Sequence, residues 1–288
     1  MIAIFTGHHA LIEGVPGVAK TLAVETLAHT VSGSFARLQF TPDLVPSDIV
    51  GTRIYRPGAE QFDTELGPVF ANFVLADEIN RAPAKVQSAL LEVMAERQVS
   101  IGGKRYPVPS PFLVLATQNP IESEGVYPLP EAQRDRFLMK ITVDYPSPVE
   151  EREIIYRMGV APPSANAVLS TGELQRLQAT SSRVFVHHAI VDYVVRVVVA
   201  TRHPAEHGMP DVAQWVAYGA SPRATIAFCR AARAQAVLSG RAHVLPEDIA
   251  HLAHRVLRHR LILGFEAVSA DVTPETVIDA ALRAVRVP

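Results

Sequence analysis

A glycine-rich segment near the start of the chain has the residue types needed to hold phosphate groups. Residues 14–21, GVPGVAKT, match the pattern G-x-x-x-x-G-K-[ST], except that Ala19 replaces the second glycine. A strand-like run precedes the segment and a helical run follows it, as a phosphate loop requires. Backbone N–H groups and a helix N-terminus would face the phosphates, Lys20 would add positive charge, and Thr21 could bind Mg²⁺. The alternative is an ordinary strand-to-helix turn.

We predict that the nucleotide contacts come from nine consecutive residues. These are Gly14, Val15, Pro16, Gly17, Val18, Ala19, Lys20, Thr21 and Leu22. Because Ala19 lies where the helix is expected to begin, we expect its methyl group to be tolerated there.

An acidic pair follows an apolar run at residues 73–78, FVLADE. Two carboxylates would therefore lie at the carboxyl end of a buried strand, where open α/β sheets keep their sites. Asp77 would hold Mg²⁺, and Glu78 would polarise an attacking water. The alternative, that the pair caps a helix beginning near Pro83, is about as good for these residues alone. The preceding phosphate loop favours catalysis.

The elements that would position these residues form two regions. Short apolar runs alternate with helical patterns in the first half of the chain, which predicts a mainly parallel sheet with helices on both faces. The runs are HALIE (9–13), FARLQF (35–40), FVLAD (73–77), FLVLAT (112–117) and FLMKITV (137–143). Helical spacing dominates the second half, at 187–200, 222–238 and 246–263. We predict a nucleotide-binding core at 1–145, a linker at 146–165 that begins the lid, and a helical lid at 166–288.

Composition excludes several classes of protein. A formal net charge of -2 provides no overall attraction to nucleic acid. Cys229 is the only cysteine, so neither an internal disulfide nor a cysteine zinc site is possible. No long apolar run and no signal-peptide pattern occur, so we expect a cytoplasmic protein without stable membrane insertion.

Four longer segments make the sequence resemble the MoxR family of AAA+ ATPases. They are EGVPGVAKT (13–21), LADEINRAPAKVQSALLEVMAERQV (75–99), ATQNPIESEGVYPLPEAQRDRF (116–137) and GASPRA (219–224). The resemblance implies a P-loop AAA+ core, with a five-stranded parallel sheet, and a smaller all-helical lid. It also implies ATP and Mg²⁺ as cofactors, a homo-oligomeric ring that is usually hexameric, and chaperone-like remodelling of client proteins. A partner with a von Willebrand factor A domain is often involved.

The same resemblance implies roles for further polar residues. Asn119 follows the strand at 112–117 and matches sensor 1, which orients the attacking water; an Asn-Pro turn is the alternative. Arg136 matches the arginine finger that reaches a neighbouring subunit's γ-phosphate, with Arg134 as a second candidate. A solvated charge cluster would also account for these arginines. Arg223 matches sensor 2, although the helix dipole disfavours an arginine in a first turn.

Two insertions in the core resemble substrate-facing loops of related rings. Residues 49–66 look like the family's helix 2 insert. Residues 97–111 look like the pre-sensor 1 hairpin, where Gly102-Gly103 between apolar positions predicts a tight turn. The contact candidates are Arg53, Tyr55, Lys104, Arg105 and Tyr106, for each of which an ordinary solvated loop position is the simpler interpretation.

The histidines do not predict a metal site. His8-His9, His187-His188 and the group in HLAHRVLRHR (251–260) lack the accompanying acid or cysteine of a zinc site. We expect no zinc, and we expect residues 251–260 to form one polar helix face.

The chain departs from the family at its start, because thirteen residues precede Gly14 where relatives carry a helical segment that helps form the adenine pocket. We therefore expect a core that lacks this segment and binds nucleotide weakly, with poor base selectivity.

Taken together, the residues predict an ATPase in which Lys20, Glu78, Asn119, Arg136 and Arg223 are catalytic and Thr21 and Asp77 hold the metal. The nearest alternative is the ATPase subunit of a magnesium chelatase. A nucleotide-binding module without turnover is an alternative from another class, and a nucleic-acid motor is disfavoured by the charge.

Overall fold

The computed structural model describes residues 1–120, 125–158 and 165–288, and these form two compact units. We call His9–Leu129 with Ile141–Gln175 the sheet unit, and Met1–His8, Pro130–Lys140 and Arg176–Pro288 the helical unit. Part of the predicted linker at 146–165 and part of the resembling segment 116–137 lie outside the described residues. The division at 145 and 165 stays a prediction.

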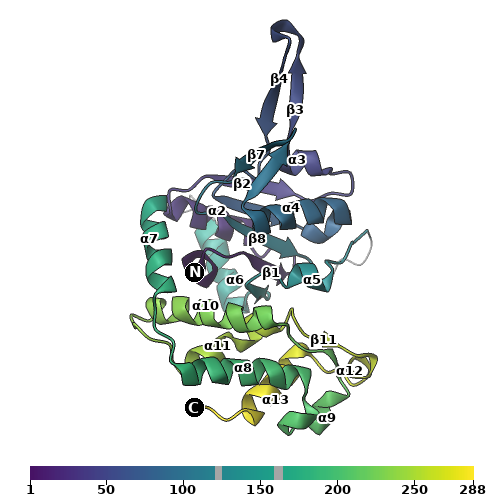
Figure 1. Ribbon diagram of the computed structural model, residues 1–288, viewed down its shortest axis with the longest axis vertical. Helices are drawn as coiled ribbons and strands as arrows, with labels where there is room; N and C mark the ends of the chain where they lie inside the picture. The colour runs from purple at the N-terminus through teal and green to yellow at the C-terminus, as the bar shows by residue number, and fades with distance from the viewer. Residues whose placement is uncertain (121–124, 159–164) are drawn as a thin grey trace. The chain divides into compact units, whose positions relative to one another are not determined.

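The sheet unit is built on a five-stranded sheet with strand order β2-β5-β8-β1-β9 (Figure 1). The strands are β1 (Ala10–Gly14), β2 (Phe35–Gln39), β5 (Phe73–Asp77), β8 (Leu113–Gln118) and β9 (Met139–Val143). The pairs β2–β5, β5–β8 and β8–β1 are parallel. All five predicted strands are confirmed, as is the mainly parallel sheet. The interior strand β5 lies between β2 and β8 and is buried along its whole length, which explains its continuous apolar run.

Helices flank this sheet. They are α2 (Lys20–Thr30), α3 (Pro46–Val50), α4 (Ala84–Glu96), α6 (Pro148–Met158) and α7 (Thr171–Ser182), the last of which ends in the helical unit. Single turns of 3₁₀ helix occur at Pro57–Ala59 and Ile79–Arg81. Helix α4 buries Val86, Leu90 and Met94, which recur at helical spacing. Each such side chain contributes about 1.5–3 kcal/mol when fully buried.

Two antiparallel hairpins belong to the same unit. One pairs β3 (Gly51–Arg56) with β4 (Gln61–Leu66) and projects from the sheet unit (Figure 1). The other pairs β6 (Gln98–Ile101) with β7 (Lys104–Pro107), and both glycines between its strands have positive φ. The predicted turn at Gly102-Gly103 is therefore confirmed.

The helical unit contains the predicted helices of the second half of the chain. Its helices are α1 (Ile2–Thr6), α5 (Glu131–Arg134), α8 (His188–Arg202), α9 (Pro210–Ala213), α10 (Pro222–Leu238), α11 (Pro246–Leu257), α12 (Phe265–Ser269) and α13 (Pro274–Ala284), with a 3₁₀ turn at Ala205–His207. Helix α10 packs against α1, α8 and α11. The unit is not wholly helical, because the short strands β10 (Val216–Tyr218) and β11 (Ile262–Leu263) pair in antiparallel fashion. Strands this short leave no periodic signal in the sequence.

The expectation of one polar helix face at residues 251–260 holds for His251, His254 and Arg255 of α11 and is wrong for His259 and Arg260. Helix α11 ends at Leu257, and two of the polar side chains that follow turn inward. His259 and Arg260 are only 3% and 8% exposed, and both bond to the carbonyl oxygen of Phe137. Burial lowers the pKa of His259 well below its ordinary value, and the charge of Arg260 lowers it further.

Among the described residues, no helix has both the length and the apolar character needed to span a membrane.

Candidate functional site

The segment 14–21 connects the end of β1 to the start of α2, as a phosphate loop requires. A Cβ atom at Gly14 would lie 2.6 Å from the backbone oxygen of Val143, so the close approach of these backbones requires glycine. Gly17 has a φ of 85°, which also favours glycine. The first turn of α2 contains no acidic residue that would repel an anion. The loop therefore offers backbone N–H groups and a helix N-terminus for phosphate.

Ala19 corrects one expectation. The residue is not in the helical conformation that tolerates a methyl group, because it precedes α2 with a φ of 56° and a ψ of 28°. In this left-handed region a Cβ atom crowds the backbone, at a cost of about 1–2 kcal/mol. The phosphate-loop pattern has glycine at this position because glycine adopts the left-handed conformation without strain, whereas this chain has alanine.

Replacing Ala19 with glycine is therefore expected to stabilise the protein. Glycine relieves the backbone strain of about 1–2 kcal/mol. Its greater freedom in the unfolded chain lowers the stability by about 0.4–1 kcal/mol, so the net gain in stability should be about 0.5–1 kcal/mol. Urea unfolding measures the change. The matched control is Ala23→Gly, which replaces an exposed alanine inside α2 and should cost a similar amount. A loss of stability in Ala19→Gly would show that the residue is unstrained.

Lys20 lies against its own loop. Its Nζ atom donates a hydrogen bond of 2.5 Å to the backbone oxygen of Gly14. The ammonium group is thus held at the loop, where a phosphate could replace the carbonyl as its partner. Thr21 lies in the first turn of α2 and is half-buried, and the next residue, Leu22, is 56% exposed.

Asp77 ends the buried strand β5 and is itself buried. One carboxylate oxygen accepts a 2.6 Å hydrogen bond from the Thr117 hydroxyl. The other accepts from the Arg37 guanidinium at 2.7 and 3.2 Å. Neighbouring strands on both sides therefore fix the carboxylate, since Arg37 is on β2 and Thr117 is on β8.

Glu78 follows in a strained backbone conformation, with a φ of 55°. Its N–H donates to the Thr117 hydroxyl at 2.8 Å, so Thr117 connects both members of the acidic pair. Its carboxylate accepts from Gln39 at 2.9 Å and from Arg81 at 3.1 Å. Non-glycine residues in this region cost about 1–3 kcal/mol and cluster at functional sites. Neither acid caps α4, whose N-cap residue is Pro83 and has no side-chain cap hydrogen bond.

Asn119 lies at the carboxyl ends of the strands, as do the phosphate loop and the acidic pair. Glu13 of β1 is the register partner of Gln118 on β8, so Asn119 follows at the level of Gly14. The side chain is buried. The structure therefore brings Asn119, the phosphate loop and the acidic pair to the carboxyl ends of adjacent parallel strands, where α/β proteins bind ligands.

The sequence did not single out Arg37, Gln39, Arg81 or Thr117. Arg37 and Gln39 alternate with the buried Leu38, so the strand pattern places them on one face. That β2 lies beside β5 could not be read from the chain, because 33 residues separate the two strands.

The oxygen donors of this arrangement suit Mg²⁺. Among the residues that the structure describes, no group of three or more histidines, cysteines and acids could hold a metal. Mg²⁺ needs no such cage, because it is usually held by one or two carboxylates together with substrate phosphates. Thr21 and Asp77 fit a metal that arrives with a nucleotide.

The two finger candidates lie in the helical unit, on either side of a buried ion pair. Asp135 accepts a 2.7 Å hydrogen bond from Arg260, whose side chain is 2% exposed. Arg134 is half-buried and lies 3.9 Å from Glu131. Arg136 is exposed, and its side chain has no hydrogen bond or ion pair with any described residue. Of the two, Arg136 is therefore the one available to another molecule.

Arg223 lies in the first turn of α10, as predicted. The Ser221 hydroxyl accepts from the Arg223 backbone N–H at 3.1 Å and donates to Asp135 at 2.7 Å. The N-cap thus ties the start of α10 to the segment that carries Arg134 and Arg136, while the Arg223 side chain is exposed.

Comparisons with known proteins agree with this geometry. Residues 9–139 match the model of the ATPase family associated with various cellular activities, and residues 210–281 match an AAA lid domain. Chaperone MoxR1 of Mycobacterium tuberculosis is 66% identical, over 100% of this chain and 76% of its own length. Protein MoxR of Paracoccus denitrificans is 33% identical, over 97% of this chain and 87% of its own. A crystal structure of a Cytophaga hutchinsonii protein superposes with a TM-score of 0.93 and 48% identity, covering 100% of this chain and 88% of that one.

Proposed function

This chain belongs to the MoxR family of AAA+ ATPases, and we propose on that basis that it hydrolyses ATP to remodel partner proteins. Family membership gives it the general function of a MoxR-type, chaperone-like ATPase. The observation that carries the hydrolysis proposal is the Thr117 hydroxyl, which joins Asp77 and Glu78 at the sheet edge where the phosphate loop begins.

In the proposed reaction the loop at 14–21 and Lys20 hold the phosphates of ATP. Thr21 and Asp77 would hold Mg²⁺, which would neutralise part of the phosphate charge. Asn119 would orient a water and Glu78 would accept its proton as the water oxygen bonds to the γ-phosphorus and the bond to the ADP oxygen breaks, which gives ADP and phosphate. Buried positions for Asp77 and Asn119 support this assignment, because buried side chains hold a fixed geometry.

Two arginines complete the proposed site. Arg136 would reach the γ-phosphate bound by a neighbouring subunit, and its exposure supports its choice over Arg134. Arg223 would respond to phosphate bound by its own subunit. The role of Arg136 requires an oligomer, for which we propose a ring, with six subunits as the family resemblance implies.

The two hairpins are the proposed client contacts. Tyr55 is 49% exposed, and Arg53 lies over the ring of Phe62 at 4.6 Å. Lys104 and Arg105 are exposed, and Tyr106 donates to Thr64 of the other hairpin at 3.0 Å. A partner with a von Willebrand factor A domain and a cytoplasmic location belong to the same proposal. We propose no nucleic acid as a partner.

Phosphate release from ATP tests the proposed activity directly. The full chain should release phosphate in the presence of Mg²⁺ and stop when EDTA removes the metal. Nucleotide binding without Mg²⁺-dependent release would instead favour the binding module. Release that depends on a magnesium-chelatase partner would favour the chelatase subunit.

Arg37 is expected to weaken the binding of Mg²⁺. Its guanidinium lies 2.7 Å from the Asp77 carboxylate and is half exposed, so it places a positive charge next to the proposed metal site. Replacing Arg37 with glutamine should tighten Mg²⁺ binding about threefold to tenfold, because a water-screened repulsion of about 1 kcal/mol is removed. A Mg²⁺ titration with a fluorescent ADP analogue measures this without turnover.

The control for Arg37 is another exposed arginine paired with an aspartate. Arg56 lies 3.0 Å from Asp63 on the β3–β4 hairpin, and Arg56→Gln should leave Mg²⁺ binding unchanged. Weaker Mg²⁺ binding in Arg37→Gln would show that the arginine mainly holds Asp77 in place.

A further inference from the structure

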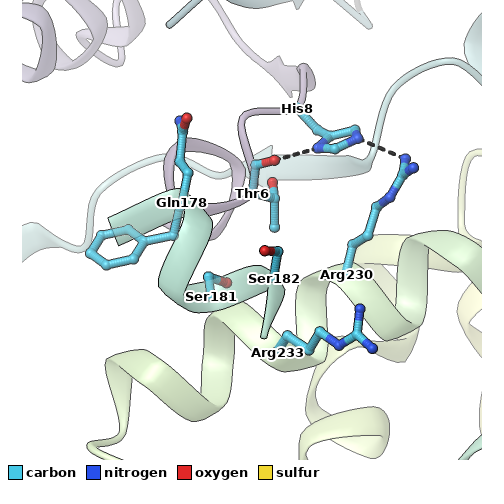
Figure 2. Close-up of a pocket in the computed structure, with 8 residues that line it drawn as sticks. Thr6, His8, Gln178, Ser181, Ser182, Arg230 and Arg233 are labelled. Atoms are coloured by element: carbon cyan, nitrogen blue, oxygen red, sulfur yellow. Dashed lines mark hydrogen bonds between the residues drawn. The ribbon is translucent and has the colours of Figure 1, made fainter. Parts of the chain in front are cut away.

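A small cavity of about 140 Å³ lies within the helical unit, and none of the residues assigned to ATP hydrolysis lines it. It is formed where α1, α7 and α10 meet (Figure 2). Its lining residues are Phe5, Thr6, His8, Gln178, Ser181, Ser182, Arg230 and Arg233. None of these eight residues is acidic, although two are arginines.

The protonation state of His8 follows from its partners. Its Nε2 atom lies 2.7 Å from a nitrogen of Arg230, and a guanidinium can only donate. Nε2 is therefore the acceptor, and Nδ1, which lies 2.6 Å from the backbone oxygen of Thr6, is the donor. His8 is neutral in this arrangement and adds no charge.

Most smaller polar groups of the cavity already have partners in the protein. The hydroxyl groups of Thr6 and Ser182 donate to backbone oxygens in their own helices, at 3.0 and 2.7 Å. The Gln178 amide donates to the backbone oxygen of Ile4 at 2.7 Å. Among the described residues that line the cavity, the charged donors that remain without a partner are N–H groups of the two arginines. Arg233 uses one N–H on the backbone oxygen of Val184, and Arg230 uses one on His8, from five donors each.

The local charge is positive on balance. The two guanidinium groups carry two full charges. Thr6 and Ser182 are the last residues of α1 and α7, and a helix C-terminus contributes about half a negative charge. Two helix ends therefore leave about one positive charge uncompensated by the lining residues.

We propose that this cavity binds a single phosphate group, free or as the monoester of a small molecule. Arginine forks match the oxygens of phosphate in paired hydrogen bonds, and about 140 Å³ suits one such group but not a whole nucleotide. A bound phosphate would be held by α10, through the remaining N–H groups of Arg230 and Arg233. Binding should therefore stabilise the helical unit.

Thermal unfolding with inorganic phosphate tests the site. At constant ionic strength, set with chloride, phosphate should raise the midpoint temperature of unfolding until the site is saturated, because a ligand that binds the folded state stabilises that state. Arg230→Gln and Arg233→Gln should each weaken the affinity at least tenfold. Arg230→Lys should have an intermediate effect, because it keeps the charge and loses the fork.

Two controls separate phosphate binding in this cavity from phosphate binding elsewhere on the chain. Arg255 contacts His251 at 3.0 Å on α11, the same kind of pair outside the cavity, and Arg255→Gln should bind phosphate normally. Lys20→Ala removes the charge of the phosphate loop and should also keep this binding. Failure of the ATPase proposal would thus leave this result unchanged.

The source of the phosphate is read from a second titration. Tighter binding of glycerol phosphate than of inorganic phosphate would identify a phosphorylated small molecule, and the reverse order would identify free phosphate. The proposal is overturned if chloride and phosphate act alike, if Lys20→Ala abolishes binding, or if both cavity variants bind as the unaltered chain does. In those cases the arginines serve only to stabilise the helix ends.

Discussion

Replacing Glu78 with glutamine is expected to slow phosphate release at least a hundredfold while ATP binding is retained. General-base groups contribute about 10²–10⁴-fold to a rate, and an amide cannot take this role. The substitution keeps the shape of the side chain. Its amide oxygen can still accept from Gln39 and Arg81, which now hold the carboxylate at 2.9 and 3.1 Å. Phosphate release and Mg²⁺-dependent ATP binding, measured on the same preparation, distinguish catalysis from folding.

Glu92→Gln is the matched control for that experiment. Glu92 is an exposed glutamate on α4 of the same unit and should not affect release. If Glu78→Gln released phosphate as fast as the unaltered chain, Glu78 would not be the catalytic carboxylate. If it lost ATP binding as well, the residue would be needed for the structure of the site.

The acidic pair shows how far the sequence alone could predict this site. An apolar run that ends in two carboxylates predicted the buried strand, its end and the position of Asp77 and Glu78. The side chains that hold the pair were missed because most come from β2 and β8, which are neighbours of β5 only through the sheet order. Strand order depends on long-range packing, which leaves no local pattern.

Backbone conformation and burial account for the remaining differences. Ala19 fits a helical start by composition, and only its φ of 56° shows the strain. His259 and Arg260 continue the polar pattern of α11, yet the helix ends at Leu257 and the chain turns them toward Phe137. Arg260 was expected on the surface because burying a charged side chain without a partner is costly. The compensating carboxylate, Asp135, lies 125 positions away in the sequence.

That distant pairing leads to the largest expected loss of stability, from Asp135→Ala. Arg260 donates to Asp135 at 2.7 Å and to the backbone oxygens of Phe137 and Leu138 at 2.6 and 3.1 Å. Burial lowers the pKa of Arg260, and the bond to Asp135 opposes that shift. Removing the carboxylate leaves a buried cation with carbonyl partners only. The expected cost is about 3–5 kcal/mol, measured by urea unfolding.

A second substitution and a nearby control make this result specific. Adding Arg260→Met to Asp135→Ala should recover much of the loss, because an apolar pair can replace a buried ion pair without leaving a charge. Glu131→Ala removes an exposed pair with Arg134 in the same segment and should cost less than about 1 kcal/mol. A similarly small cost for Asp135→Ala would mean that water reaches Arg260. Since Asp135 lies between Arg134 and Arg136, a large cost would show that the segment carrying both finger candidates is held in place by the buried Arg260.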